Sequence, residues 1–289
     1  MDLALQLLVN GIINGSHYAL LGVGFGLIFG PTKITHFAFG PIFAVAAYVC
    51  WAAATKLGMP LAAAALVGIA ASAAAGVLSY LWLYRPFERQ GSSHLVVLIA
   101  SLGLFITLEN AIGIVFGTDT KVIADLSPDI FLWGPVVVTS IQLWQVAALA
   151  LIAGLLAAFL RGSRHGKAIM AMTDNGEMAQ IIGIDTVRVS ILAFAAGSAV
   201  AAVPAVLILF KEGATPHMGF VAVFMAFVAV VVGGIGSFRG AIIGGYAVGI
   251  VENIGMWEIP TEWQSTIAFV VLFLILLFRP AGLFGRALR

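Results

Sequence analysis

Two glycine-rich strings approach motifs that cradle phosphate groups, and both fall short of them. Residues 162–168, GSRHGKA, are one residue short of the phosphate-loop pattern G-x-x-x-x-G-K-[ST] and end in alanine instead of a hydroxyl residue. Residues 234–240, GIGSFRG, miss the dinucleotide spacing G-x-G-x-x-G by one position and follow no soluble strand. The sequence therefore predicts no nucleotide site in this chain.

Metal ligands and nucleophiles are too dispersed to form a site. The single cysteine, Cys50, lies inside an apolar run, which excludes a disulfide and a cysteine metal cluster. The five histidines stand on separate segments without the i, i+4 pairing of a helical zinc site: His17, His36, His94, His165 and His217. No nucleophile motif is present, so we expect a non-catalytic chain that binds no cofactor of its own.

Polar side chains inside long apolar runs are the remaining chemical signal. Ionisable groups at membrane depth are costly, and they usually face a bundle interior or an aqueous path. Glu109, followed by Asn110, lies centrally in its run and predicts either part of a translocation path or a hydrogen bond to a neighbouring helix. Asn14, Ser16 and His17 lie in the first run, where His17 is expected to donate a hydrogen bond inside the bundle.

The composition defines the elements that must position these residues. The chain has 289 residues, of which 62% are hydrophobic and 9% charged, and its mean hydropathy is +1.10, far outside the range of a soluble domain. The net charge of +1 excludes a nucleic-acid role argued from charge. The first segment has Asp2 where a signal peptide needs positive charge, so we expect it to be retained.

Nine apolar runs predict an all-α polytopic membrane protein with one transmembrane domain over residues 1–289. A spanning helix needs about 20 residues, and most of the runs qualify. The runs are 3–29, 37–55, 61–84, 95–116, 141–160, 189–210, 220–232, 241–254 and 266–278. The two around GGIGSFRG are short, and they predict either a re-entrant pair or helices that continue through the glycines. We therefore expect a bundle of about eight or nine segments. Glu252, near the end of its run, is expected to extend its carboxylate to the membrane surface.

The positive-inside rule orients this bundle. If residues 161–188 are cytoplasmic, ten basic residues lie inside and three outside, with Arg239 undecided. Those inside are Lys33, Arg85, Arg89, Arg161, Arg164, Lys167, Arg188, Arg279, Arg286 and Arg289; those outside are Lys56, Lys121 and Lys211. The C-terminus is then cytoplasmic, and the N-terminus lies outside if the first run crosses the membrane. Residues 117–140, which include Asp125, form a long outer loop.

Glycine spacing predicts close helix packing. Glycines recur every four residues at 22, 26 and 30, at 236, 240 and 244, and at 245 and 249. Small residues at this spacing let helix backbones approach closely. We expect packing within the chain rather than a subunit interface, and no internal sequence repeat is visible.

Residues 161–188 are the longest stretch that cannot lie in lipid. Asp174 and Glu177 form a capping-box pattern, which predicts a short helix over residues 175–182 with a helix-stopping Gly183 after it. Residues 178, 181 and 182, all apolar, share one face of that helix by i, i+3, i+4 spacing. We expect a second short helix upstream, linked to the first at positions 173 and 174, and Asp185 as the cap of the next spanning helix.

The apolar surface of this segment predicts one of two contacts. An upstream turn with Ile169, Met170 and Met172 adds to it. The segment is either a loop that packs its apolar face on its own membrane domain, or a surface that docks on another protein.

Five stretches in order resemble branched-chain amino acid permeases of the LivH type. They are residues 8–20 (LVNGIINGSHYAL), the end of that first unit at Gly30, residues 166–185, residues 231–237 (VVGGIGS) with residues 240–245, and residues 277–285 (LFRPAGLFG). Each stretch alone is weak, but together they cover nearly the whole chain. One stretch departs from the family, because the chain has HFAFG at residues 36–40 where the family commonly has Asn-Phe-Ala-His-Gly.

The resemblance implies a permease subunit of an ATP-binding cassette importer in a bacterial inner membrane. Its partners would be a second related permease, two ATP-binding subunits that use the ATP, and an extracytoplasmic solute-binding protein. The implied ATPase-coupling residues are Gly166, Met170, Asp174, Asn175, Glu177, Met178, Ala179, Ile181, Ile182 and Gly183. The expected translocation-path residues are Asn14, Ser16, His17, His36, Glu109 and Asn110.

The absence of Lys and Arg from the central segments favours a small neutral or zwitterionic solute. An aliphatic amino acid fits that lining, and urea or short amides are the alternative within the same class. An ion-coupled secondary transporter with Glu109 as its ion site is the alternative from another class, and a membrane scaffold is a third.

Overall fold

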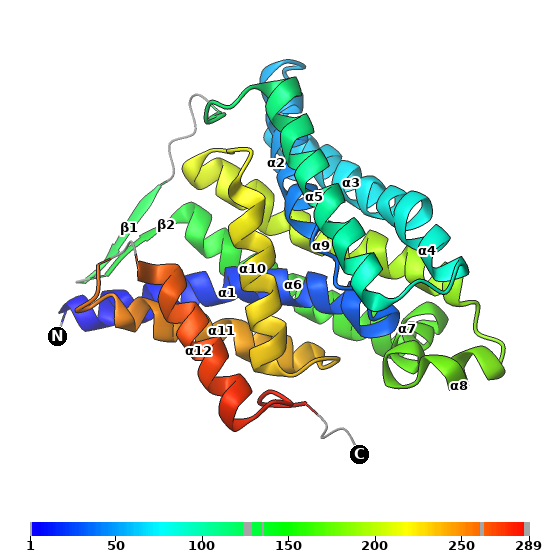
Figure 1. The fold of residues 1–289 in the computed structure, drawn as a ribbon. Coiled ribbons are helices and arrows are strands. Elements are labelled where there is room, and N and C mark those ends of the chain that lie inside the picture. Colours follow the sequence, from blue (N-terminus) through cyan, green and yellow to red (C-terminus); the bar gives the residue numbers. More distant parts are fainter. Residues whose placement is uncertain (1, 124–128, 135, 261–262, 286–289) are drawn as a thin grey trace.

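The structure is a computed structural model that describes residues 2–123, 129–134, 136–260 and 263–285, so Asp125, Arg286 and Arg289 lie outside the described residues. Its helices are α1 (Asp2–Thr32), α2 (Phe39–Thr55), α3 (Leu61–Ser79), α4 (Arg85–Arg89), α5 (His94–Phe116), α6 (Ser140–Gly162), α7 (Arg164–Asp174), α8 (Gly176–Ile181), α9 (Thr186–Glu212), α10 (Met218–Gly233), α11 (Phe238–Gly255) and α12 (Gln264–Phe278). A π-helical segment, Tyr80–Tyr84, joins α3 to α4. Figure 1 shows the bundle, with the short α7 and α8 at one end and strands β1 and β2 at the other.

Each of the nine predicted apolar runs forms a helix, which confirms the all-α membrane class. In the described ranges, five helices are long and apolar enough to cross a membrane, or six if a bent pair counts as one span. The expected bundle of eight or nine membrane segments, some of them re-entrant, is therefore not confirmed in number. The count is lower than nine because α2 and α12, with 17 and 15 residues, are too short to be counted as spans. In addition, α10 and α11 meet at a bend of 114° and count at most as one span.

Side-chain caps fix where several helices begin. Ser93 accepts a hydrogen bond from the backbone N–H of Val96 at the start of α5, and Thr139 with Gln142 forms a reciprocal capping box at the start of α6. Asp185 accepts from the N–H of Arg188 at 3.1 Å, so the predicted cap of α9 is confirmed. These contacts satisfy amides that a helix leaves free in its first turn.

Helix α1 crosses the whole bundle and connects its two ends (Figure 1). At its first turns, the side-chain nitrogen of Gln6 donates to the carbonyl of Val137 in strand β2. Just after its last turn, Lys33 Nζ donates to the carbonyl of Thr173 in α7 at 3.2 Å. The first apolar run therefore crosses, and the N-terminus lies at the end opposite to α7.

The basic residues of the two predicted sides lie at opposite ends of the helices. Lys56 and Lys121 both lie over the ring of Trp51, beside the outer end of α5. Lys33 lies at the α7 end, as does the undecided Arg239, because its neighbour Phe238 packs against the hydrophobic cluster of α6 and α7. Arg239 thus lies at the same end as the residues predicted to be cytoplasmic.

The outer loop contains an antiparallel hairpin that the all-α prediction missed. Strand β1 (Ile130–Trp133) pairs with β2 (Val136–Thr139), with Ile130 opposite Thr139. Val136 and Val138 are buried against Ile13 of α1. The hairpin covers the outer end of α1 and does not enter the bundle.

Glycines set the closest helix contacts, as the sequence predicts. Gly245 faces the backbone of Ala19, and Gly249 faces Gly15, so α11 lies directly on α1 without intervening side chains. Added Cβ atoms at these positions would overlap the opposite backbone. The contacts lie within the chain, which confirms packing inside the subunit at these glycines.

Helices α2 and α10 begin inside the bundle rather than at its ends. Ser101, on α5, accepts from the backbone N–H of Phe37 at 2.7 Å, and the ring of Phe105 lies beside Gly40 in the first turn of α2. At a rise of 1.5 Å per residue, Phe105 lies roughly 16 Å along α5 from His94. The backbones of Gly40 and Gly219 meet directly, so both N-termini lie beside the middle of α5.

The units α1–α2 and α9–α10 run in opposite directions around this meeting point. Helix α1 runs toward the α7 end and α2 returns outward, whereas α9 runs outward and α10 returns toward the α7 end (Figure 1). The two long helices cross where a Cβ on Gly24 would lie 2.7 Å from the carbonyl oxygen of Gly197. This is an inverted pair of helical units, which the sequence did not reveal as a repeat.

Candidate functional site

The segment predicted to be cytoplasmic, residues 161–188, contains two short helices held against α6 and α9. Ser163 accepts from the N–H of Gly166 at 2.8 Å and starts α7 directly after α6. Asn175 accepts from the N–H of Met178 at 3.0 Å and starts α8. The predicted cap at Asp174 is therefore wrong, because Asp174 is still the last residue of α7 and the turn falls one residue later.

Helix α8 is anchored by one residue and exposes its apolar face. Ala179 is 1% exposed and packs with a cluster of α6, α7 and α9 residues. Met178, Ile181 and Ile182 are 54%, 78% and 67% exposed. Gly183 has φ 89° and ends the helix as predicted. Met178, Ile181 and Ile182 therefore form an apolar face that the described part of this chain leaves uncovered.

The upstream helix contributes less apolar surface than expected. Ile169 and Met172 are buried in the cluster beneath α7, and only Met170 is exposed. Gly166 has no room for a side chain because the carbonyl of Phe159 lies against it. Helix α7 thus uses two of its three predicted surface residues to attach itself to the bundle. Glu177, on α8, is exposed.

A direct link joins this segment to the start of α2. Lys33 has a left-handed backbone (φ 56°), which is unusual for a residue with a side chain. Its ammonium donates to the last turn of α7 through the Thr173 carbonyl. Partial burial lowers the pKa of Lys33, and the carboxylate of Asp174 acts in the opposite sense. Lys33, which bonds to α7, stands three positions before His36 in the sequence.

His36 is held in a buried polar chain rather than open to a path. Its Nδ1 lies 2.7 Å from the hydroxyl of Tyr84, which donates to Ser101 at 2.8 Å. Since the Tyr84 proton goes to Ser101, the hydroxyl accepts from His36 Nδ1–H. Nε2 of His36 is buried and has no hydrogen-bond partner in the described residues.

The polar residues of α1 form a second, separate group. Asn14 donates to the side-chain oxygen of Asn253 at 3.3 Å, and Ser16 donates to the carbonyl of Ile13 in its own helix. His17 is 8% exposed and packs edge-on against Phe43. These three predicted path residues lie in the interior between α1 and its neighbours.

Glu252 lies beside this group, and its predicted extension to the surface is wrong. The residue is completely buried, and Tyr18 and Gln264 are the polar side chains that interact with it. Its carboxylate oxygens have no regular hydrogen bond in the described residues. The helix α12 covers α11 at this point, so a side chain near the helix end has no route to water.

Glu109 forms a third group, with a partner that the sequence did not indicate. Its carboxylate accepts from Nδ1 of His217, the residue immediately before α10. The neighbouring Asn110 is exposed and bonds to the carbonyl of Ile106 in its own helix. The six predicted path residues therefore form three separate groups. His217 reaches Glu109 because α10 begins beside the middle of α5.

Short apolar helices that start inside a bundle of longer apolar helices, with an apolar helical face left uncovered at one end, are the architecture of a membrane transport permease. Residues 7–276 match the family described as "Branched-chain amino acid transport system / permease component", and the chain belongs to that family. It is a multi-pass inner-membrane protein.

Several relatives match over almost their full length. The chain is 34% identical over 296 residues to the high-affinity branched-chain amino acid transport system permease protein BraD of Pseudomonas aeruginosa, covering 98% of this chain and 96% of that one. It is 35% identical over 302 residues to the corresponding protein LivH of Escherichia coli K12, with the same coverage. The solved structure of PsaBC from Streptococcus pneumoniae in complex with Fab has a TM-score of 0.53 at 12% identity, covering 95% of this chain and 92% of that one, which shows the fold alone.

Proposed function

We propose that this chain is the permease subunit of an ATP-binding cassette importer that carries branched-chain amino acids across the inner membrane. The observation that carries the proposal is the exposed apolar face of α8, Met178 with Ile181 and Ile182, at the cytoplasmic end. Two relatives of nearly equal length are named as branched-chain amino acid permeases, which supports the substrate class.

The face of α8 docks on an ATP-binding subunit, and that subunit uses the ATP. Three apolar side chains more than half exposed to water gain free energy when a partner covers them. Movement of α7 then reaches the start of α2 through Lys33 and its bond to Thr173. Nucleotide-driven closure of two such subunits would favour one of two permease conformations, which is what coupling requires.

A second, related permease completes the path. Helix α5 is the least buried of the long apolar helices, with Ser101 and Ile112 as its only buried residues. Asn110 and Thr107, exposed near the middle of α5, would be costly against lipid. A partner permease covers this face and encloses an aqueous path along Glu109 and Asn110. A solute-binding protein outside the membrane delivers the amino acid.

Two other functions make different demands. A permease for urea or short amides would keep the same subunits and would transport a neutral amide. An ion-coupled secondary transporter would use Glu109 as its ion site, and it would need no partner that hydrolyses ATP. The uncovered α8 face favours the importer over the secondary transporter.

Uptake by the full system tests the proposal. Radiolabelled leucine is supplied to proteoliposomes that contain both permeases and the ATP-binding subunits, with the solute-binding protein outside and ATP inside. Leucine uptake that needs ATP and is competed by isoleucine and valine is the expected result. Uptake driven by an ion gradient without ATP, or competition only by urea and amides, would overturn it.

A further inference from the structure

Two pairs of side chains connect α5 to the first turn of α10 on the uncovered face. The carboxylate of Glu109 accepts from Nδ1 of His217, and one turn away the rings of Phe105 and Phe220 meet edge to face at 6.4 Å. Residues four apart on α5 and three apart on α10 lie on the same helix face, so the two contacts lie one above the other along the helices. Glu109 is therefore held by His217 about one helical turn from the contact between Phe105 and Phe220.

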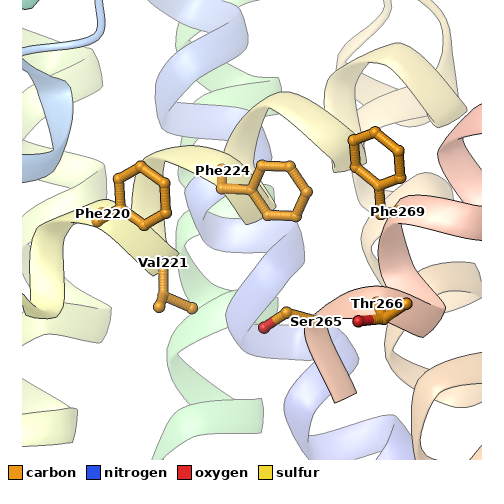
Figure 2. A pocket seen from close by; sticks show the side chains of 6 residues that line it. All are labelled: Phe220, Val221, Phe224, Ser265, Thr266 and Phe269. Carbon is orange, nitrogen blue, oxygen red and sulfur yellow. The ribbon is translucent and has the colours of Figure 1, made fainter. Parts of the chain in front are cut away.

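An aromatic groove lies between α10 and α12, and Phe220 belongs both to it and to the contact with Phe105. Figure 2 shows its lining, with Phe220, Val221 and Phe224 from α10 and Ser265, Thr266 and Phe269 from α12. The rings of Phe224 and Phe269 stack at 6.3 Å. The groove encloses about 340 Å³, at the lower end of small-molecule sites. Its size and lining suit an aliphatic side chain.

The helices around Glu109 carry no permanent positive charge. Neither α5, α10 nor α12 contains Lys or Arg. In the described part of the chain, only one of the two Glu109 carboxylate oxygens is hydrogen bonded, and it is bonded to His217. The second oxygen is available to a ligand, and Glu109 is 17% exposed. A carboxylate beside an apolar groove complements a ligand that joins an ammonium group to an aliphatic chain.

We propose that Glu109 and the α10–α12 groove form a subsite for the aliphatic amino acid in transit. Glu109 binds the ammonium group, the groove takes the side chain, and His217 is a positioning residue that orients the carboxylate. This inference rests on the proposed function for the identity of the substrate. The site is weakly occupied, since it is open and its polar contacts are few, which suits a step that must release its ligand.

Ligand-observed NMR on the assembled transporter without its binding protein tests the subsite directly. Saturation transferred from the protein to the methyl groups of leucine reports occupancy of an aromatic groove at weak affinity. The ammonium analogue 3-methylbutylamine should compete with leucine. The carboxylate analogue 4-methylpentanoate, which has the same side chain as leucine and no ammonium group, should not compete. Equal competition by both analogues would overturn the proposal.

Glu109→Gln removes the charge and keeps the size of the side chain. We expect a leucine signal at least tenfold weaker, and leucine uptake at least tenfold lower per ATP hydrolysed. Glu88→Gln is the control, because it removes a carboxylate on α4 that is bonded to Tyr80 and does not line the groove, and it should leave both values unchanged. An unchanged signal in Glu109→Gln would overturn the subsite.

Two further measurements keep the outcome interpretable. If Glu109→Gln does not assemble, Glu109→Asp withdraws the carboxylate by one methylene and should also weaken the signal, and an unweakened signal would overturn the proposal. If the wild type binds 3-methylbutylamine through Glu109 but takes up no leucine, the proposed function fails and the ammonium site stands.

Discussion

Ile181→Asp places a carboxylate in the middle of the α8 face and leaves the rest of the bundle untouched. Complete burial of an isoleucine side chain stabilises by about 1.5–3 kcal/mol. Ile181 is 78% exposed in the free subunit, so about 2 kcal/mol of this remains to be gained on docking. An unpaired polar group in an apolar contact costs about 2 kcal/mol more.

The sum of about 4 kcal/mol corresponds to a roughly thousandfold weaker complex with the ATP-binding subunits. The free subunit should not lose stability, because exposed substitutions usually change it by about 0.5 kcal/mol or less. Co-purification of the ATP-binding subunits with the tagged permease measures the first quantity, and thermal unfolding of the purified permease measures the second.

Gln180→Asp is the matched control for this experiment. It adds the same charge to the same helix, one residue away and outside the apolar face. We expect normal assembly and normal ATP hydrolysis in this variant. The docking argument is refuted if Ile181→Asp and Gln180→Asp retain equal amounts of the ATP-binding subunits, since α8 would then be a loop without a partner.

Three further outcomes follow from the fold. A cysteine at Asp119 should react with an impermeant maleimide on intact cells and one at Asn175 should not; reaction at the second position would reverse the orientation. Lys33→Met removes the bond between the α1–α2 turn and α7, so uptake should fall several-fold while ATP hydrolysis continues; an unchanged ratio of uptake to hydrolysis would contradict the link. Gly219→Ala adds a methyl group where two backbones already touch and should lower thermal stability by several kcal/mol, whereas Gly154→Ala, which points into open space, should stabilise by up to about 1 kcal/mol; similar melting temperatures for the two would contradict the packing.

Local features of the chain were predictable from the sequence. Apolar runs locate every long helix, because burial in lipid requires a continuous apolar surface. The cap at Asp185 and the stop at Gly183 follow from side-chain chemistry within one turn. The sequence predicts Asp174 as the cap of α8, whereas Asn175 is its cap in the structure. Two adjacent residues can both cap a helix, and only the length of α7 decides between them.

Features that depend on how distant segments pack were not predictable. Composition could not indicate that α2 and α10 start inside the bundle, since a shorter apolar helix has the same kinds of residues as part of a full-length one. The sequence therefore predicts His217 to be a loop residue, although its side chain bonds to Glu109. Glu252 reads as a residue near a surface, although α12 covers it, because a sequence does not show which helix lies over another.

The contact between Gly40 and Gly219 has a genetic consequence. In ordinary packing, an enlarged residue can be compensated when its neighbour becomes smaller. Both residues here already lack a side chain, so neither can yield space to the other. A suppressor screen that starts from Gly219→Ala should therefore return true revertants or changes that shift a whole helix, and no substitution at Gly40. The two codons are constrained together, although no side chain connects them.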